Sequence, residues 1–196
     1  MSDFIIYDVD SAPEASRGTL ADAQKQYGMV PNLMGIMAES PALVRTYAEV
    51  GKAFESSSLS PLEQQLVVLT ASFLNECSYC MGAHSMIAKM VGFPAIEVEA
   101  LREGRPLDDP RLETLRAFTR AVVRGRGSVS RPQVEEFLRA GFTKAQLLDV
   151  VLGVAFKTLS NYTNHIVGTP LDEAFAAEAW RAPVSEADLS PLPVES

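Results

Sequence analysis

Apolar residues recur at helical spacing along most of the chain, and the alternating apolar and polar pattern of a β-strand is almost absent. The one β-like run is Phe4-Ile5-Ile6-Tyr7, which predicts an extended N-terminal arm over about residues 1–12. The tail after Trp180 is rich in Pro, Ser and acidic residues, which predicts a second arm or a disordered segment over about residues 181–196. The pattern therefore predicts one all-α domain over residues 1–196 with a short extension at each end.

Helix starts are marked by a capping residue followed by proline, or by a capping box in which Ser or Thr is followed three residues later by Glu or Gln. These starts are Ser40-Pro41, Ser60-Pro61 with Glu63, Asp109-Pro110, and Thr143 with Gln146. Gly92-Phe93-Pro94 is typical of a helix end. The helix that begins at Asp109-Pro110 is expected to run to about Arg124, before the loop Gly125 to Ser128.

Two parts of the chain resemble one another when the sequence is shifted by 83 residues. The matched positions are Ser60 with Thr143, Glu63 with Gln146, Val67-Val68-Leu69 with Val150-Val151-Leu152, Phe73 with Phe156, and Tyr79 with Tyr162. This match predicts a degenerate internal repeat of one helical hairpin. Cys77 and Cys80 fall on Ser160 and Thr163, so the second copy has no thiols.

The composition limits the range of functions. The chain has 196 residues, 47% of them hydrophobic, and a net charge of −8, which is typical of a globular protein. Nucleic acids and anionic membrane surfaces bind positively charged patches, so neither is an expected partner. We find no secretory signal and no apolar stretch that could span a bilayer, and we therefore expect a cytoplasmic protein.

The two cysteines of the chain, Cys77 and Cys80, lie three residues apart, with His84 four residues further on. On a helix these three positions share one face, so the two thiols can approach a disulfide and His84 can reach the sulfur of Cys80. Asn75 is a candidate N-cap, which would place the thiols near the positive end of the helix dipole, where a thiolate is favoured.

Three interpretations of this cluster remain open from the spacing alone. In a redox site, Cys80 attacks a peroxide or a disulfide and Cys77 resolves the product. In a metal site, the two cysteines and His84 bind zinc with a fourth ligand, for which His165 is the candidate. In a structural role, the cysteines are small core residues and His84 is a hydrogen-bonded core histidine.

The motif and its flanks resemble the carboxymuconolactone decarboxylase superfamily, and more closely its alkyl hydroperoxidase D-like, peroxidase-related branch. The family pattern is a glutamate, eleven residues, and then C-x-x-C-x-x-x-H, whose second part is intact here. The other matching segments are Tyr27 to Leu33, Ser40 to Leu43, Asn164-His165, and Thr169 to Asp172. The resemblance covers about residues 12 to 180.

This resemblance implies an all-α, alkyl hydroperoxidase D-like helical bundle that assembles as a homo-oligomer, as a dimer, trimer or hexamer. It also implies a thiol-dependent peroxidase acting on organic or hydrogen peroxides. Cys80 would become the sulfenic acid, Cys77 would be proton donor and disulfide partner, and His84 would belong to the proton relay. No haem, flavin or metal would be required. A protein or small-molecule dithiol would supply electrons.

The chain departs from the pattern at Gln65, which stands twelve residues before Cys77 where the family has glutamate. Glutamine forms hydrogen bonds but does not take up a proton near neutral pH. We therefore predict a hydrogen-bonding role for Gln65 and keep as an alternative a dithiol/disulfide oxidoreductase without peroxidase activity. A metal-binding or structural oligomeric protein is the third hypothesis. Tyr79 and His165 are candidate substrate-binding residues.

Overall fold

The computed structural model describes residues 4–183, and over this range it contains helices and no strand. The α-helices are α1 (Glu14–Tyr27), α2 (Asn32–Met37), α3 (Pro41–Glu55), α4 (Pro61–Leu74), α5 (Ser78–Met90), α6 (Ala95–Glu103), α7 (Pro110–Arg124), α8 (Arg131–Arg139) and α9 (Lys144–Val167), and the 3-10 helix η1 (Glu173–Glu178) follows. The predicted all-α class is confirmed. The predicted C-terminal tail lies outside the described residues except for 181–183.

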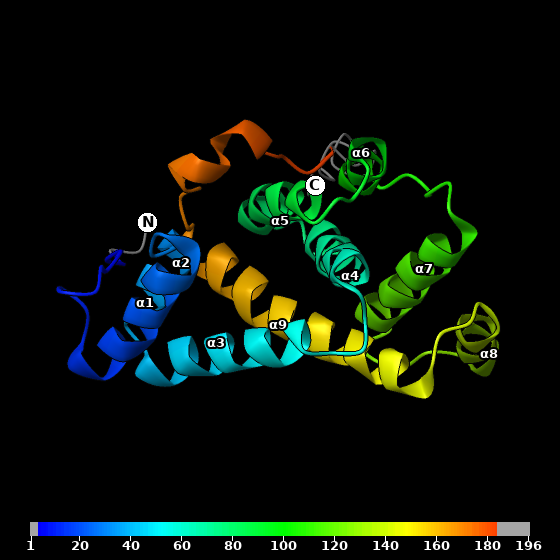
Figure 1. The fold of residues 1–196 in the computed structure, drawn as a ribbon, viewed down its shortest axis with the longest axis horizontal. Coiled ribbons are helices and arrows are strands. Elements are labelled where there is room, and N and C mark those ends of the chain that lie inside the picture. The colour runs from blue at the N-terminus through cyan, green and yellow to red at the C-terminus, as the bar shows by residue number, and fades with distance from the viewer. Residues whose placement is uncertain (1–3, 184–196) are drawn as a thin grey trace, which may run out of the picture.

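The long helix α9 connects the two ends of the molecule (Figure 1). Helices α1 and α2 lie at one end, α7 and α8 lie at the other, and α3 runs beside α9. Helix α4 occupies the centre, where it packs against α5, α7 and α9. None of the helices in residues 4–183 is long and apolar enough to cross a membrane.

The buried apolar side chains form two clusters. The larger one includes Leu66, Leu69 and Leu115 and joins α4 to α6, α7 and α9. The smaller one is built from α1, α2, α3 and the start of α5, and it includes both cysteines. The thiols are therefore held between tightly packed elements and not on a surface loop.

Local capping chemistry produced the predicted helix starts. The side chain of Ser40 accepts a hydrogen bond from the backbone N–H of Leu43, and Asp109 accepts hydrogen bonds at the start of α7. Both bonds of a capping box are present at Ser60 with Glu63 and at Thr143 with Gln146. Each cap pairs backbone N–H groups that the first turn of a helix leaves without partners.

The two copies of the predicted hairpin repeat agree in their first helix only, because the second copy does not turn back on itself. Helix α4 ends before Glu76, whose φ of 54° lies in the left-handed region, and α5 then begins in a new direction. In the second copy the corresponding residues 158–160 lie inside α9, which continues without a break. The side chain of Thr158 donates a hydrogen bond to the carbonyl oxygen of Val154, one turn earlier, so this segment stays helical.

Of the predicted N-terminal arm, residues 4–8 have no regular secondary structure and lie against α2, whereas residues 9–11 form a turn. The backbone N–H of Tyr7 donates to the carbonyl oxygen of Gly35 at 3.3 Å. A Cβ atom at Gly35 would lie 2.7 Å from the carbonyl oxygen of Tyr7, so only glycine permits this close approach. The hydroxyl of Tyr7 also donates to Glu39 at 2.6 Å, which fixes the arm further.

Candidate functional site

The two thiols lie at the N-terminal end of α5. Cys77 occupies the N-cap position, where its side chain forms no capping bond, and Cys80 lies in the first turn. Asn75, the predicted cap, is instead the C-cap residue of α4, because the left-handed Glu76 separates it from α5. The expected proximity of the thiols to the helix N-terminus nevertheless holds, and the helix dipole there favours a thiolate.

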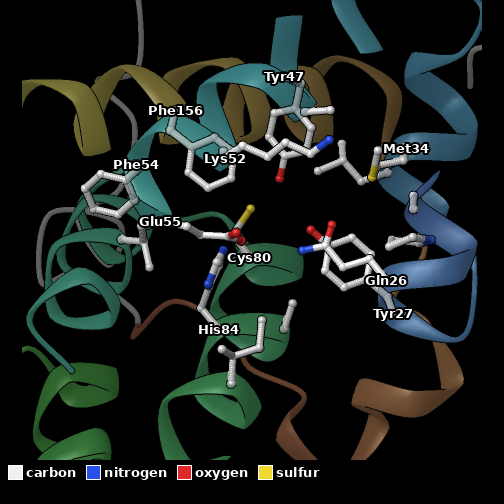
Figure 2. Close-up of a pocket in the computed structure, with 18 of the residues that line it drawn as sticks. Gln26, Tyr27, Met34, Tyr47, Lys52, Phe54, Glu55, Cys80, His84 and Phe156 are labelled. Atoms are coloured by element: carbon white, nitrogen blue, oxygen red, sulfur yellow. The ribbon is translucent and has the colours of Figure 1, made fainter. Parts of the chain in front are cut away.

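A cavity of about 610 Å³ opens beside this helix end, between α1 and α3 on one side and α5 and α9 on the other. Figure 2 shows Cys80 and His84 pointing into it from α5, with Tyr47 and Phe156 across from them. Cys80 is among the lining residues, whereas Cys77 is not, although both side chains are almost fully buried. A small reactant in the cavity therefore meets Cys80 first.

Both cysteines are free thiols, and they share one amide donor. The Nδ2 atom of Asn164 lies 3.4 Å from each sulfur. The sulfur of Cys80 also lies 3.6 Å from the hydroxyl of Ser160 on α9. Donors directed at sulfur stabilise its anionic form more than its neutral form.

The environment separates the two thiols in acidity. Burial alone would raise the pKa of Cys80, but the hydrogen bond from Cys77 and the positive charge of Lys157 outweigh burial. Together with hydrogen bonds from α9 they lower the pKa of Cys80 to about 5. The pKa of Cys77 is raised, first because its thiol donates to Cys80 and then because it is buried. One thiolate beside one neutral thiol is the arrangement expected of an attacking and a resolving cysteine.

The hydrogen-bond partners of His84 differ from the predicted one, which was the sulfur of Cys80. Its Nδ1 atom lies 3.0 Å from Oε1 of Gln65, and its Nε2 atom lies 2.8 Å from Nζ of Lys157. Because the ammonium of Lys157 can only donate, Nε2 accepts, and Nδ1–H donates to Gln65. Burial and then the charge of Lys157 lower the pKa of His84 well below its usual value, which keeps the ring neutral. Neither ring nitrogen is left to bind a sulfur.

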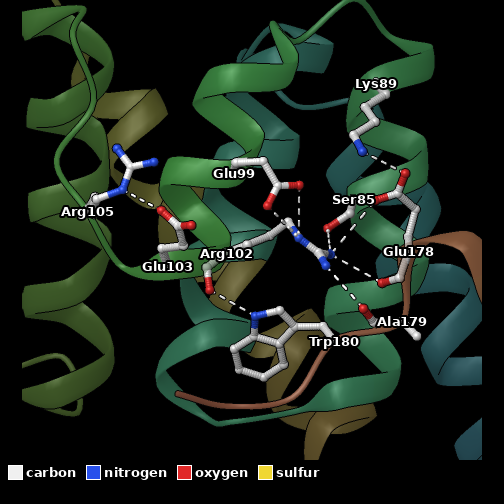
Figure 3. Close-up of polar contacts among 9 residues, drawn as sticks. All are labelled: Ser85, Lys89, Glu99, Arg102, Glu103, Arg105, Glu178, Ala179 and Trp180. Atoms are coloured by element: carbon white, nitrogen blue, oxygen red, sulfur yellow. Dashed lines mark hydrogen bonds and ion pairs between the residues drawn. The ribbon is translucent and has the colours of Figure 1, made fainter. Parts of the chain in front are cut away.

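The C-terminal segment holds α5 in place from its other side. The guanidinium of Arg102 on α6 donates to Ser85 on α5 and to the carbonyl oxygens of Glu178 and Ala179 (Figure 3). The indole of Trp180 donates to the carbonyl oxygen of Arg102 at 2.8 Å. These bonds fasten η1 and the following residues across α5 and α6. The helix that bears Cys80 and His84 is thus fixed on both faces.

The sequence profile of the Carboxymuconolactone decarboxylase family matches residues 39–121, a range that includes Gln65, both cysteines and His84. This central part of the chain is therefore similar to the Carboxymuconolactone decarboxylase family. No curated protein matches it significantly. Among solved structures, similar ones include an alkylhydroperoxidase AhpD core protein, described as an uncharacterized peroxidase-related protein, from Ralstonia eutropha JMP134. Its TM-score is 0.78 at 21% identity, over 88% of this chain and 93% of that one.

Two further structures have the same fold. An uncharacterized peroxidase-related protein from Silicibacter sp. TM1040 has a TM-score of 0.77 at 20% identity, over 90% of this chain and 94% of that chain. A variant of the debrominase Bmp8, in complex with 2,3,4-tribromopyrrole, has a TM-score of 0.74 at 17% identity, over 91% and 96% of the two chains. The AhpD-like fold therefore carries proteins with more than one described activity.

The flanking segments that carry the superfamily resemblance meet in space. Asp172 is buried, and its carboxylate accepts from the backbone N–H of Asn32 at 2.9 Å and from the hydroxyl of Tyr79 at 2.6 Å. The amide of Asn32 donates in turn to the carbonyl oxygen of Pro170. Tyr79 lines the cavity, but its hydroxyl is engaged by Asp172 and Leu33. These segments join α2 and α5 to the region before η1.

The second candidate histidine, His165, does not join this site. His165 is exposed on α9 and is not among the residues that line the cavity. Its neighbour Asn164 faces inward and contacts both sulfurs instead. Across residues 4–183, no group of three or more His, Cys, Asp or Glu side chains is placed to hold a metal ion. The zinc interpretation, with His165 as the fourth ligand, therefore has no support among the described residues.

Sequence reasoning missed Lys157, a fully buried lysine at the cavity. A signal was present, because Lys157 is the only basic residue in the apolar stretch from Leu147 to Leu159. A charged residue on an otherwise apolar helix face is rarely buried without a partner. The sequence did not reveal which partner the fold would supply.

Proposed function

We propose that this protein is a thiol-dependent peroxidase that reduces organic or hydrogen peroxides through Cys80 and Cys77. The observation that carries the proposal is the asymmetry of the pair. Cys80 lines the cavity and has a lowered pKa, whereas Cys77 lies behind it as a neutral thiol with a raised pKa. A thiolate is the reactive form toward peroxides, and a neighbouring thiol captures the product.

The proposed reaction has three steps. The Cys80 thiolate attacks the terminal peroxide oxygen, the O–O bond breaks, and the leaving oxygen takes a proton to form an alcohol or water. The resulting sulfenic acid is attacked by the thiol of Cys77, which forms the disulfide and releases water. A dithiol donor then reduces the disulfide, is itself oxidised to a disulfide, and returns one thiol and one thiolate to the protein.

Peroxide consumption in the presence of a dithiol reductant tests this proposal. We expect turnover by the wild type, none by Cys80→Ser, and a single turnover by Cys77→Ser that leaves a sulfenic acid on Cys80, detectable by mass spectrometry. Ser78→Ala is the matched control, because Ser78 lies between the cysteines but is exposed. Equal rates for the wild type and Cys80→Ser would refute the proposal.

A second candidate is a dithiol/disulfide oxidoreductase without peroxidase activity, which Gln65 favours. The superfamily glutamate can carry a proton, whereas the carbonyl of Gln65 only accepts from His84. This candidate predicts reduction of a small disulfide substrate by the wild type and no consumption of any peroxide. Running both substrates side by side, with Cys80→Ser as the blank, separates the two functions.

A further inference from the structure

Lys157 is a buried cation without a carboxylate partner. Its side chain is 0% exposed, and its Nζ atom lies 2.8 Å from Nε2 of His84 and 4.8 Å from the ring centre of Phe156. Among residues 4–183, no aspartate or glutamate forms an ion pair with it. A buried charge is costly unless an opposite charge lies close to it.

The groups around Lys157 leave one candidate for that opposite charge. His84 is neutral and Gln65 carries no charge, so neither balances the ammonium. Cys80 and Lys157 line the same cavity, and the positive charge of Lys157 lowers the pKa of Cys80. The hydroxyl of Tyr47 also faces Cys80, but burial raises its pKa and it stays neutral.

We infer that Lys157 is the counter-ion of the Cys80 thiolate and the acid that protonates the leaving oxygen of the peroxide, in the place where the superfamily pattern uses a glutamate. The second half of this inference rests on the proposed peroxidase function, whereas the first half does not. Gln65 and His84 then act as positioning residues: Gln65 fixes the ring of His84, and Nε2 of His84 holds the ammonium.

The proton balance of the cycle follows from this assignment. When Cys80 becomes a sulfenic acid, its negative charge passes to the leaving oxygen, which takes a proton from the Lys157 ammonium and departs as a neutral alcohol or water. Lys157 is then a neutral amine beside a neutral sulfur, so no charge is left unpaired in the core. Reduction of the disulfide by a dithiol returns the proton to Lys157 and the negative charge to Cys80.

Other ionisable groups of the cavity lie further toward water. They are Asp22 and Tyr27 on α1 and Arg45, Glu49, Lys52 and Glu55 on α3. All six are exposed, so solvent screens their charges. The ionisable groups of the inner cavity wall are His84 and Tyr79 from α5, Tyr47 from α3 and Lys157 from α9, and Cys77 is hydrogen-bonded to Cys80. If the pKa of Cys80 changes when Lys157 is replaced, the cause therefore lies among these inner groups and not among the six exposed ones.

Substitution of Lys157 by methionine tests the counter-ion role, because methionine fills a similar volume without charge. Alkylation of Cys80 by iodoacetamide, followed across pH by mass spectrometry, reports its apparent pKa. We expect that pKa to rise by about 1 to 3 units in Lys157→Met. Lys157→Arg should stay near the wild type, as should Lys144→Met, which removes an exposed lysine from the same helix. An unchanged pKa in a folded Lys157→Met protein would overturn the inference.

The proton-donor role is tested with two oxidants. An alkyl hydroperoxide releases a basic alkoxide that needs a proton, whereas a peracid releases a carboxylate that does not. At a pH where Cys80 is fully ionised in both proteins, Lys157→Met should slow oxidation by the hydroperoxide at least about tenfold and leave the peracid reaction nearly unchanged. Equal slowing with both oxidants would contradict this role.

Absence of any peroxide reaction in the wild type would refute the peroxidase function, while the alkylation profile would still decide the counter-ion role.

Discussion

At the scale of single residues, the side chain at position 65 decides whether the hydrogen-bonded network of His84 and Lys157 contains a negative charge. The oxygen of Gln65 accepts from His84, and the other nitrogen of that ring binds Lys157. With glutamate here, the same geometry would place an anion two hydrogen bonds from the ammonium of Lys157. With glutamine, the nearest fixed charge in this network is the ammonium of Lys157.

Gln65→Glu should therefore raise two pKa values together. The new carboxylate favours the protonated form of His84, so the ring gains a proton at a higher pH than in the wild type. It also offsets the charge of Lys157, so the pKa of Cys80 rises from about 5 toward its usual value, by roughly 1 unit or more. NMR titration of the His84 ring and the alkylation profile of Cys80 measure the two changes.

Gln65→Leu is the control for this prediction, because it removes the hydrogen bond to His84 without adding charge. The pKa of His84 should remain low in Gln65→Leu, since burial and the charge of Lys157 are the causes of its present shift. If Gln65→Glu left the titration of Cys80 unchanged, the charge of Lys157 would not be coupled to the thiol through this network.

At the scale of elements, the break between α4 and α5 places the thiols at a helix start. Glu76 adopts a φ of 54°, a conformation that costs a residue with a Cβ atom about 1 to 2 kcal/mol. The break puts Cys77 at the N-cap and Cys80 in the first turn of α5. Without it, α4 would continue as α9 does, and the sulfurs would lie in the middle of a helix.

Glu76→Gly should stabilise the protein because glycine adopts this φ without steric conflict. Part of the gain is offset by the greater freedom of glycine in the unfolded chain, so we expect the free energy of unfolding to rise by roughly 0.5 to 1 kcal/mol. Urea denaturation measures the change. Glu76→Gln keeps the strain and removes only the charge of an exposed side chain, so it should match the wild type. Destabilisation in Glu76→Gly would mean that the carboxylate has a structural partner.

Helix boundaries were predictable from the sequence because caps act within three or four residues. The starts at Ser40, Ser60, Asp109 and Thr143 are each specified by neighbouring side chains. The placement of Cys80 and His84 on the same cavity wall agrees with their helical spacing in the same way. The repeat predicted a second hairpin, but α9 is continuous there. This difference could not be predicted, because the backbone conformation of Glu76 is not evident from a pattern that two apolar helices share.

The partners of the thiols could not be predicted because they come from residues more than seventy positions away. Lys157 and Asn164 reach the site only through the packing of α9 against α4 and α5. The spacing of Asn164 and His165 could not decide which of the two faces inward. Their adjacent positions on a helix differ by about 100°, and tertiary contacts set the rotation of the helix.

At the scale of the whole molecule, one face of α9 presents apolar side chains to the outside. Leu148, Val151, Tyr162 and Ile166 are exposed, and their spacing places them along one side of the helix. The opposite side of α9 packs against α3 and α4. An apolar stripe of this length on a soluble monomer is unusual, and a second copy of the chain is the occupant we expect.

We predict that the protein is a homo-oligomer assembled through this stripe. Light scattering should give a mass that is a multiple of 21.3 kDa. The double variant Leu148→Glu with Ile166→Glu should lower that mass, because burying two carboxylates in an apolar interface is unfavourable. Ile96→Glu is the matched control, since Ile96 is equally exposed but lies on α6. A monomeric wild type would contradict the prediction.

The amide of Asn164 that touches both sulfurs has a consequence for the lifetime of the protein in the presence of oxidant. Thiol proteins are inactivated when a sulfenic acid meets a second peroxide before its partner cysteine arrives, since the sulfinic acid then formed is not reduced by thiols. Here the partner cysteine is already held at 3.4 Å from the same nitrogen, so no rearrangement of the chain delays its attack. We expect the protein to keep its thiols through oxidant loads that would permanently damage a thiol protein whose cysteines must first move together.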